Sequence, residues 1–243
     1  MIGTTVYCLA MGRNTAAPQL RVPSVALNVA AVRKRIAAAA GRAGRSPSEV
    51  TLVAVTKTVD ATAVKEAYAA GLRHFGESRI QEAKEKLPQL SGLRPAPIWH
   101  LVGHLQTNKA KTAAELFDVI HSVDSLKVAE AISQHADCDR SILVQVNVAG
   151  EASKQGFTLQ DTIAALERIA CLPHLRIRGL MTIAPYADDP EEARPVFRRL
   201  RLMRDSLGLE HLSMGMSHDF EVAIEEGATM VRIGQAIFGE REE

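Results

Sequence analysis

The chain has 243 residues and a mass of 26.3 kDa, which suffices for one large domain or two small ones. Its 29 Lys and Arg residues are almost balanced by 28 Asp and Glu residues, and aromatic residues make up only 4% of the chain. Nucleic-acid binding relies on excess positive charge and on aromatic stacking, so this composition argues against it. A hydrophobic fraction of 47% is that of a folded protein.

The three cysteines, Cys8, Cys138 and Cys171, are odd in number and widely spaced, which fits neither a disulfide framework nor a zinc knuckle. A reducing, cytoplasmic location is therefore expected. The chain has no apolar run long enough to span a membrane and no positively charged secretory signal. Residues 1–23 have no hydrophobic periodicity, and we expect them to form a loose leader before a single domain over 24–243.

From Val25 onward, short apolar runs alternate with longer amphipathic stretches. A helix is expected over 26–43, followed by a nearly continuous apolar strand over 50–55, of the kind that is buried on both faces in a parallel sheet. Asp60 can cap a second helix that ends at Gly71. Further strands are expected over 73–75, 98–102, 118–121, 142–148, 176–181, 211–214 and 229–233, with helices between them that include 124–135, 159–170, 191–207 and 217–226.

Eight strands that alternate with helices over about 190 residues favour a single (β/α)₈ TIM barrel, with a doubly wound open sheet as the alternative. No shift in composition and no long linker indicates a second domain. The active face of such a barrel lies at the carboxyl ends of its strands. Polar residues that directly follow the apolar runs are therefore the candidates for chemistry.

Lys57 is the first of these candidates, because it directly follows the apolar strand that ends at Val55 and Thr56. A lysine in partly apolar surroundings can have a lowered pKa, which leaves a neutral amine able to form a Schiff base with an aldehyde or ketone. The alternative interpretation is a surface lysine at the end of a strand.

The second candidate is an anion site near the end of the chain. Ser217 follows the seventh strand and is expected to cap the next helix and to direct free backbone amides outward. Gly234 follows the eighth strand and lets a ligand approach the backbone closely. The loops after strands seven and eight often bind phosphate in TIM barrels. Arg232 is expected to point into the same mouth, where its cation would meet a ring nitrogen or a carboxylate.

Other polar residues carry weaker expectations. His100 and His104 are four positions apart, but on a strand this spacing does not direct both rings to one metal, so no metal site is predicted. Glu77, Ser78 and Asn147 could reach the mouth but are expected to be structural. An amine and a phosphate site on one face suit a ligand with both an aldehyde and a phosphate. Pyridoxal 5′-phosphate (PLP) fits that description, and so does the substrate of a Schiff-base aldolase that acts on sugar phosphates.

Eight segments of the sequence form a more specific pattern: VAVTK (53–57), FGESRIQE (75–82), WHLVGHLQTNK (99–109), HSVD (121–124), QVNVAGEASKQG (145–156), IRGLMTI (177–183), LSMGMSHDF (212–220) and MVRIGQAIFGER (230–241). With these segments the chain resembles the YggS/PROSC family of pyridoxal phosphate homeostasis proteins, from near Val25 to Glu240. The resemblance implies a barrel like the N-terminal domain of alanine racemase, that is, a fold type III PLP protein.

The resemblance also implies roles for individual residues. Lys57 would hold PLP as an internal aldimine, and Ser217 and Gly234 would hold the phosphate. Met214 and Gln235 complete the expected set of cofactor-binding residues. Gln235 stands where Thr or Ser is frequent in the family, so its backbone amide is the group expected to reach the phosphate. Arg232 would face the pyridine nitrogen and leave it unprotonated, which makes the ring a weak electron sink.

Members of the family resemble carriers or buffers of PLP that supply apo-enzymes, so a non-catalytic, cytoplasmic, monomeric PLP carrier is expected. A weak PLP-dependent racemase or lyase and a Schiff-base aldolase remain the alternatives. In alanine racemase, one acid-base group comes from a second domain and a partner subunit. This chain ends just after the eighth strand, so the cofactor is expected to lie on an open face.

Overall fold

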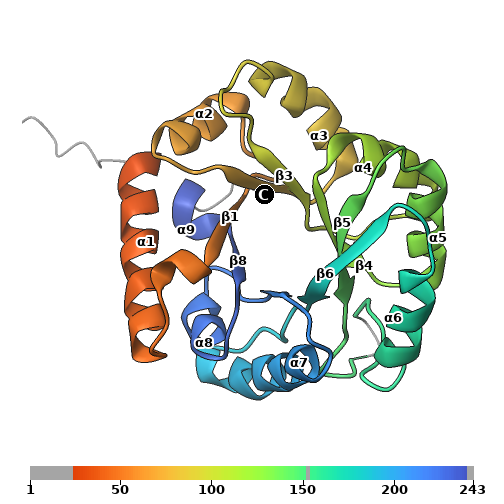
Figure 1. Cartoon of the computed structure of the whole chain (residues 1–243). Helices are drawn as coiled ribbons and strands as arrows, with labels where there is room; N and C mark the ends of the chain where they lie inside the picture. The colour runs from red at the N-terminus through yellow and green to blue at the C-terminus, as the bar shows by residue number, and fades with distance from the viewer. Residues whose placement is uncertain (1–23, 152–153, 240–243) are drawn as a thin grey trace, which may run out of the picture.

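Eight strands form a closed parallel barrel in the computed structural model, which describes residues 24–151 and 154–239. The strands follow one another around the barrel in chain order, from β1 to β8. Figure 1 looks along the barrel and shows helices α1 to α8 as a ring outside the strands, with α9 between α1 and β1. This architecture confirms the predicted (β/α)₈ barrel and excludes the open sheet. The leader expected over 1–23 lies outside the described residues.

The strands and helices occur close to where the hydrophobic pattern predicts them. The strands are β1 (Thr51–Val55), β2 (His74–Glu77), β3 (Ile98–Leu101), β4 (Val119–Val123), β5 (Arg140–Gln145), β6 (Leu175–Met181), β7 (His211–Ser213) and β8 (Met230–Ile233). The α-helices are α1 (Val25–Arg42), α2 (Ala61–Ala69), α3 (Ile80–Lys86), α4 (Ala110–Leu116), α5 (Leu126–His135), α6 (Thr162–Ala170), α7 (Arg194–Ser206), α8 (Phe220–Glu225) and α9 (Gln235–Phe238). Short 3₁₀ helices are η1 (Pro47–Glu49), η2 (Leu87–Leu90), η3 (Thr107–Lys109) and η4 (Pro190–Ala193).

Helix α1 shows how the sequence shapes the outer ring. The Ser24 side chain accepts a hydrogen bond from the backbone amide of Leu27 and caps the helix. Val29, Val32 and Ile36 recur at helical spacing and are all buried, so one face of α1 packs against the barrel wall. Of the helices in 24–151 and 154–239, α1 included, none has the length and apolar character needed to cross a bilayer.

Strand β5 is shorter than predicted, because it ends at Gln145 and not at Val148. The chain leaves the barrel there: Val146 forms an isolated bridge with Phe157, and the Asn147 amide donates to the Phe157 carbonyl over 2.8 Å. The apolar run thus continues past the strand into a loop that packs on the barrel's carboxyl end.

The pairing of β1 with β8 closes the barrel and positions its first and last strands. Val53 lies opposite Arg232, and Ala54 lies opposite Ile233. Because the strands are parallel, their carboxyl ends meet at the same rim. Residues that follow β1 and β8 are therefore neighbours in space although they are far apart in the sequence.

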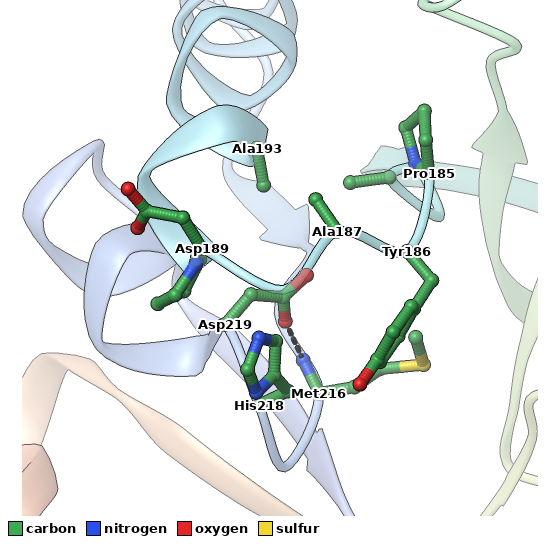
Figure 2. Close-up of a pocket in the computed structure, with 10 residues that line it drawn as sticks. Pro185, Tyr186, Ala187, Asp189, Ala193, Met216, His218 and Asp219 are labelled. Carbon is green, nitrogen blue, oxygen red and sulfur yellow. Dashed lines mark hydrogen bonds between the residues drawn. The ribbon is translucent and has the colours of Figure 1, made fainter.

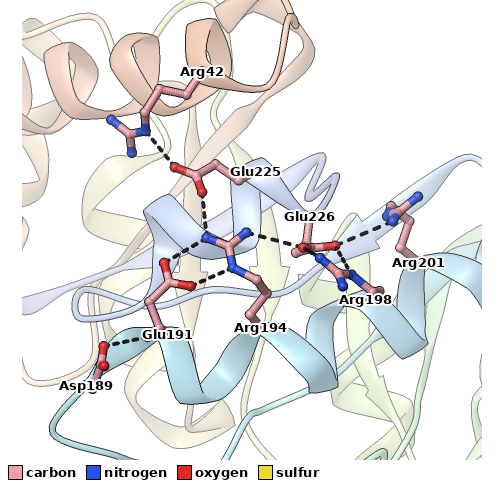
Figure 3. Close-up of polar contacts among 8 residues, drawn as sticks. All are labelled: Arg42, Asp189, Glu191, Arg194, Arg198, Arg201, Glu225 and Glu226. Carbon is pink, nitrogen blue, oxygen red and sulfur yellow. Dashed lines mark hydrogen bonds and ion pairs between the residues drawn. The ribbon is translucent and has the colours of Figure 1, made fainter.

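A network of ion pairs joins α1, α7 and α8 on the outside of the barrel (Figure 3). The Glu226 carboxylate is almost fully buried and lies 2.8 Å from Arg198, 3.2 Å from Arg194 and 3.5 Å from Arg201. Arg194 also bonds Glu225, which in turn bonds Arg42 of α1. Burial acts to raise the pKa of Glu226, but hydrogen bonds from Arg198 and Arg194 outweigh it and lower this pKa below its ordinary value.

Substitution of Glu226 tests this network. We expect Glu226→Gln to lower the free energy of unfolding by about 1–3 kcal/mol at neutral pH, because three guanidinium groups lose a charged acceptor. A group whose folded-state pKa is depressed stabilises the fold above its ordinary pKa, so the difference from wild type should vanish as the pH falls through the folded-state pKa of Glu226. Urea unfolding at several pH values measures both effects.

Glu130→Gln is the matched control, because Glu130 forms one exposed ion pair with Arg168 at 3.8 Å. Such a pair contributes about 0–1 kcal/mol. Equal losses for the Glu226 and Glu130 variants, or a Glu226 loss that persists at acid pH, would contradict the assigned role of the network.

Candidate functional site

A pocket of about 420 Å³ opens at the carboxyl end of the barrel. It brings together five of the six residues that the sequence singled out, from the ends of β1, β7 and β8: Lys57, Ser217, Arg232, Gly234 and Gln235. Val55, Val102 and Ile183 form apolar walls, and Ser78 and Gly103 complete the side nearest β2 and β3. The early amine and the late anion site thus share one mouth.

The Lys57 backbone is held on both sides by residues of α3. Just before it, the Thr56 carbonyl accepts a hydrogen bond from Lys86 Nζ over 2.6 Å. Just after it, the Thr58 amide donates to Glu82 Oε2 over 2.8 Å. Thr58 has a φ of 61°, a left-handed conformation that costs a β-branched residue of order 1–3 kcal/mol. The contacts from α3 therefore fix a strained turn that presents the Lys57 amine at the mouth.

A buried ion pair lies beneath this turn. Lys86 Nζ lies 2.6 Å from Glu77 Oε1, and the Thr56 hydroxyl donates to the same oxygen over 2.6 Å. The other oxygen, Glu77 Oε2, is buried and has no partner among the described residues. Burial raises the pKa of Glu77, although hydrogen bonds from Lys86 and Thr56 act to lower it. Glu77 is thus structural, as expected, and supports the Lys57 turn from inside.

Arg232 lies at the base of the pocket, and its side chain is buried. One guanidinium nitrogen donates to Ser213 Oγ over 2.6 Å, and the other donates to the Thr182 carbonyl over 2.9 Å. Burial lowers the pKa of Arg232 to about 10, so the side chain is still a cation at neutral pH. A fixed positive charge therefore faces the pocket from below.

Ser217 does not cap α8, and that prediction is wrong. The helix begins at Phe220 with Asp219 as its N-cap residue, and the Asp219 carboxylate accepts a hydrogen bond from the Met216 amide over 2.6 Å. Asp219 thus closes a turn over residues 216–219, directly before the helix. The Ser217 hydroxyl instead accepts a 3.4 Å hydrogen bond from the Ala236 amide, at the start of α9.

The chain near Ser217 and Gly234 carries free backbone donors. Within the described ranges, the amides of Ser217, His218 and Gln235 donate to no protein acceptor. Gly234 is the N-cap residue of α9, with a φ of −115° that any residue can adopt. Unpaired amides of this kind, next to a cation, suit a phosphate or another small anion.

Met214 lies elsewhere than the other predicted residues. Its side chain is fully buried in the hydrophobic core, and its amide donates to the Met230 carbonyl over 3.2 Å. Neither group is free for a ligand at the mouth. Met216, two residues later, is exposed and lines the pocket in its place.

A small second pocket adjoins the mouth, and sequence reasoning did not find it (Figure 2). The Tyr186 ring is 81% exposed and lies over the His218 ring, with centroids 5.4 Å apart. His218 is held in turn by the Asp188 carbonyl at 3.1 Å. The larger pocket is lined by Tyr186, His218 and Met216 as well, so this aromatic pair forms part of its rim.

The two histidines considered for a metal point apart. His104 Nδ1 lies 2.8 Å from Asp124 Oδ2, whereas the His100 ring lies inside the barrel, 2.8 Å from His121. No group of three metal-ligating side chains comes together in the part of the chain that the structure describes. Asn147 binds its own loop, since its Nδ2 donates to the Glu151 carbonyl over 2.9 Å. Asn147 is thus structural, as expected.

Glu82 and Lys86 are the supporting residues that sequence reasoning missed. They are four positions apart, which places them on one face of α3, but the sequence alone does not show that this face lies against the Lys57 turn. The buried polar residues inside the barrel, His121 and Ser213 among them, were missed for the same reason.

Comparison with known proteins identifies the family. Residues 27–242 match the family model for the N-terminal domain of alanine racemase. The pyridoxal phosphate homeostasis protein of Pseudomonas aeruginosa is 48% identical over 225 residues, which cover 90% of this chain and 96% of that protein. The chain belongs to the family of pyridoxal phosphate homeostasis proteins.

Two further proteins are similar over most of the chain. The pyridoxal phosphate homeostasis protein of Aquifex aeolicus is 44% identical, over 86% of this chain and 95% of that protein. The solved structure of PipY from Synechococcus elongatus, with PLP bound, has a TM-score of 0.78 and 39% identity, and covers 88% of this chain and 100% of PipY. The resemblance drawn from the sequence segments is therefore confirmed.

The buried pair beneath Lys57 gives a stability prediction. We expect Lys86→Met to lower the free energy of unfolding by about 3–5 kcal/mol at neutral pH, since Glu77 is left as an unpaired buried charge. The pKa of Glu77 is already raised by burial, so the loss should shrink as the pH falls and this carboxylate takes up a proton. Chemical unfolding at neutral and acid pH provides the measurement.

Lys84→Met serves as the control, because Lys84 is exposed on the same helix, and a change of no more than about 0.5 kcal/mol is expected there. The double variant with Glu77→Gln and Lys86→Met should recover part of the stability. A Lys86 variant as stable as the Lys84 variant would show that the pair does not support the turn.

Proposed function

We propose that this protein carries and buffers PLP, holding it covalently through Lys57. One observation carries the proposal: an exposed lysine, a buried cation and three free backbone amides line or border a single pocket. PLP has an aldehyde that condenses with an amine, and a phosphate that needs hydrogen-bond donors. The residues present therefore fit the cofactor that the family name and the PipY structure indicate.

Each part of the pocket has a distinct task in this proposal. The Lys57 amine bonds the cofactor, and the α3 contacts hold that amine at the mouth. The amides of Ser217, His218 and Gln235 bind the phosphate in this proposal. Val55, Val102 and Ile183 pack against the faces of the ring.

Arg232 is the feature that favours a carrier over an enzyme. PLP supplies catalytic power when bound by drawing electrons through a protonated ring nitrogen. Arg232 has donors only and is a cation at neutral pH, so it hydrogen-bonds a bare nitrogen and does not protonate it. Weakened electron withdrawal suits storage and release more than carbanion chemistry.

The finer details of the proposal are the partners and the setting. We propose that the protein acts as a cytoplasmic monomer and gives PLP to apo-enzymes through the open mouth at which Lys57 is exposed. A transfer assay in which loaded protein activates an apo-PLP enzyme faster than free PLP at the same concentration would support this step.

Covalent loading at Lys57 is the first test. Protein incubated with PLP and passed through a desalting column should keep an absorbance band of lysine-bound PLP, and Lys57→Ala should lose it. Lys154→Ala is the control, because Lys154 is an exposed lysine that lines a neighbouring pocket. Wild-type protein that retains no band under these conditions would rule out the carrier.

The same preparations separate the competing functions. Steady turnover of an amino acid, faster than with free PLP and abolished by Lys57→Ala, would favour a racemase or lyase. Borohydride trapping of a sugar phosphate but never of PLP would favour an aldolase. The carrier predicts neither result.

The phosphate site gives a second test. Ser217→Ala should weaken PLP retention by roughly threefold to tenfold, the order expected for one lost or loosened hydrogen bond. It should leave the unfolding curve unchanged, since the hydroxyl is at the rim. Equilibrium dialysis with PLP measures the first quantity and urea unfolding the second. Unchanged retention would place the phosphate elsewhere.

A further inference from the structure

A continuous chain of hydrogen bonds crosses the interior of the barrel beneath the pocket. It begins at Arg232, passes through Ser213, and continues through three histidines on neighbouring strands. His121 Nδ1 lies 2.8 Å from Ser213 Oγ, His121 Nε2 lies 2.8 Å from His100 Nδ1, and His100 Nε2 lies 3.0 Å from His74 Nδ1. The last ring, His74, lines a separate pocket among residues at the amino ends of β1 and β2.

The Arg232 cation at one end fixes which group donates and which accepts in every hydrogen bond of this series. Arginine has no acceptor, so Arg232 donates and Ser213 Oγ accepts. The Ser213 hydroxyl is then free to donate its own proton to His121 Nδ1. A neutral His121 that accepts at Nδ1 carries its proton on Nε2 and donates to His100 Nδ1. The same logic gives His100 a proton on Nε2, which it donates to His74 Nδ1.

The opposite direction leaves a buried donor without a partner. If His121 donated from Nδ1, Ser213 Oγ would accept two hydrogen bonds and its own proton would need another acceptor. Ser213 is fully buried, and no such acceptor is found for it in residues 24–151 and 154–239. An unsatisfied buried hydroxyl carries a substantial free-energy penalty. The direction away from Arg232 is therefore strongly preferred.

The surroundings of the two central rings agree with neutral histidines. Burial lowers the pKa of His100 to about 3 and holds the pKa of His121 well below its ordinary value. Each ring then has one donor and one acceptor, which a directional chain requires.

We propose that Ser213, His121 and His100 are positioning residues for Arg232 and couple its alignment to the protonation of His74 at the other end of the barrel. This rests on the proposed function, because Arg232 is taken to face the ring nitrogen of PLP. A protonated His74 would present a donor at Nδ1 toward the Nε2 proton of His100. Either that hydrogen bond breaks, or the whole chain reverses and leaves the Ser213 hydroxyl unpaired.

When the chain of hydrogen bonds reverses, Ser213 Oγ must accept from His121 as well as from Arg232, so protonation of His74 and alignment of Arg232 oppose each other, and by reciprocity each weakens the other. Burial lowers the pKa of His74 below its ordinary value, although the charge of the Asp118 carboxylate acts to raise it. The His100 ring is the other group that faces His74. Arg33 and Arg73 line the same pocket as His74 and add positive charge. PLP affinity is thus expected to fall as the pH drops through the pKa of His74.

The direction of the chain can be measured without any cofactor. Nitrogen-15 NMR of histidine-labelled, PLP-free protein should show His121, His100 and His74 as neutral rings protonated at Nε2 near neutral pH. His121 or His100 protonated at Nδ1, or charged, would overturn the proposal. Because PLP is absent, this result stands apart from any failure of the proposed function.

Two serine variants then test the link to Arg232. Ser213→Ala removes the hydroxyl that accepts from Arg232 and links it to His121, so PLP affinity should fall by roughly tenfold, the order for a lost hydrogen bond to a charged group. Ser122→Ala is the control. Ser122 is also buried, but it donates to the Gly103 carbonyl and takes no part in the chain of hydrogen bonds from Arg232 to His74. PLP affinity that falls no further in Ser213→Ala than in Ser122→Ala would refute the link to Arg232.

His74→Asn tests the coupling across the barrel. The asparagine oxygen lies near the position of Nδ1, so it still accepts from His100 but does not titrate. Comparison with wild type over pH 5–8 removes the titration of PLP itself, which both proteins share. The wild-type protein should lose more PLP affinity at the acid end than the variant does. Parallel pH curves for the two proteins would refute the coupling.

Discussion

The pairing of β1 with β8 is the contact on which the site depends. It closes the barrel and sets Val53 opposite Arg232. Because the strands run parallel, Lys57 after β1 and Gly234 after β8 reach the same rim. A slip of one residue between these strands would turn Arg232 from the interior to the outer face, since side chains alternate along a strand. The register of a single strand pair thus determines whether a cation lies beneath the Lys57 pocket.

Two buried polar groups then support the two ends of the pocket. Lys86, Glu77 and Thr56 hold the strained turn that carries Lys57. The histidine chain and Ser213 hold Arg232. Buried polar groups are costly unless their hydrogen bonds are made, so both clusters fix one arrangement and penalise others. Together they hold the Lys57 turn and the Arg232 side chain in place before a ligand binds.

Much of the fold follows from hydrophobic pattern. The eight apolar runs predicted the eight strands, because a parallel barrel buries both faces of each strand. The start of α8 was misplaced, since Ser217 and Asp219 are both good N-cap residues and only the turn closed by Asp219 decides between them. Met214 was also expected among the cofactor-binding residues, but its side chain is buried in the core and does not line the pocket.

The site could be predicted only as far as positions at strand ends. Lys57 and Gly234 directly follow apolar runs, so the barrel rule places them at the rim. The contacts of Glu82, Lys86 and the inner histidines depend on which side chains face inward across different strands, and single-sequence patterns do not contain that pairing. His100 illustrates the difference: its spacing from His104 raised the question of a metal, whereas its partners come from β2 and β4.

A crystal structure of the protein with PLP is the decisive measurement. We expect a covalent bond between PLP and Lys57 Nζ, the phosphate on the amides near Ser217 and Gln235, and the ring nitrogen within hydrogen-bonding distance of Arg232. A cofactor bound to another lysine, or a phosphate away from these amides, would contradict the claim that one rim provides both the amine and the anion site.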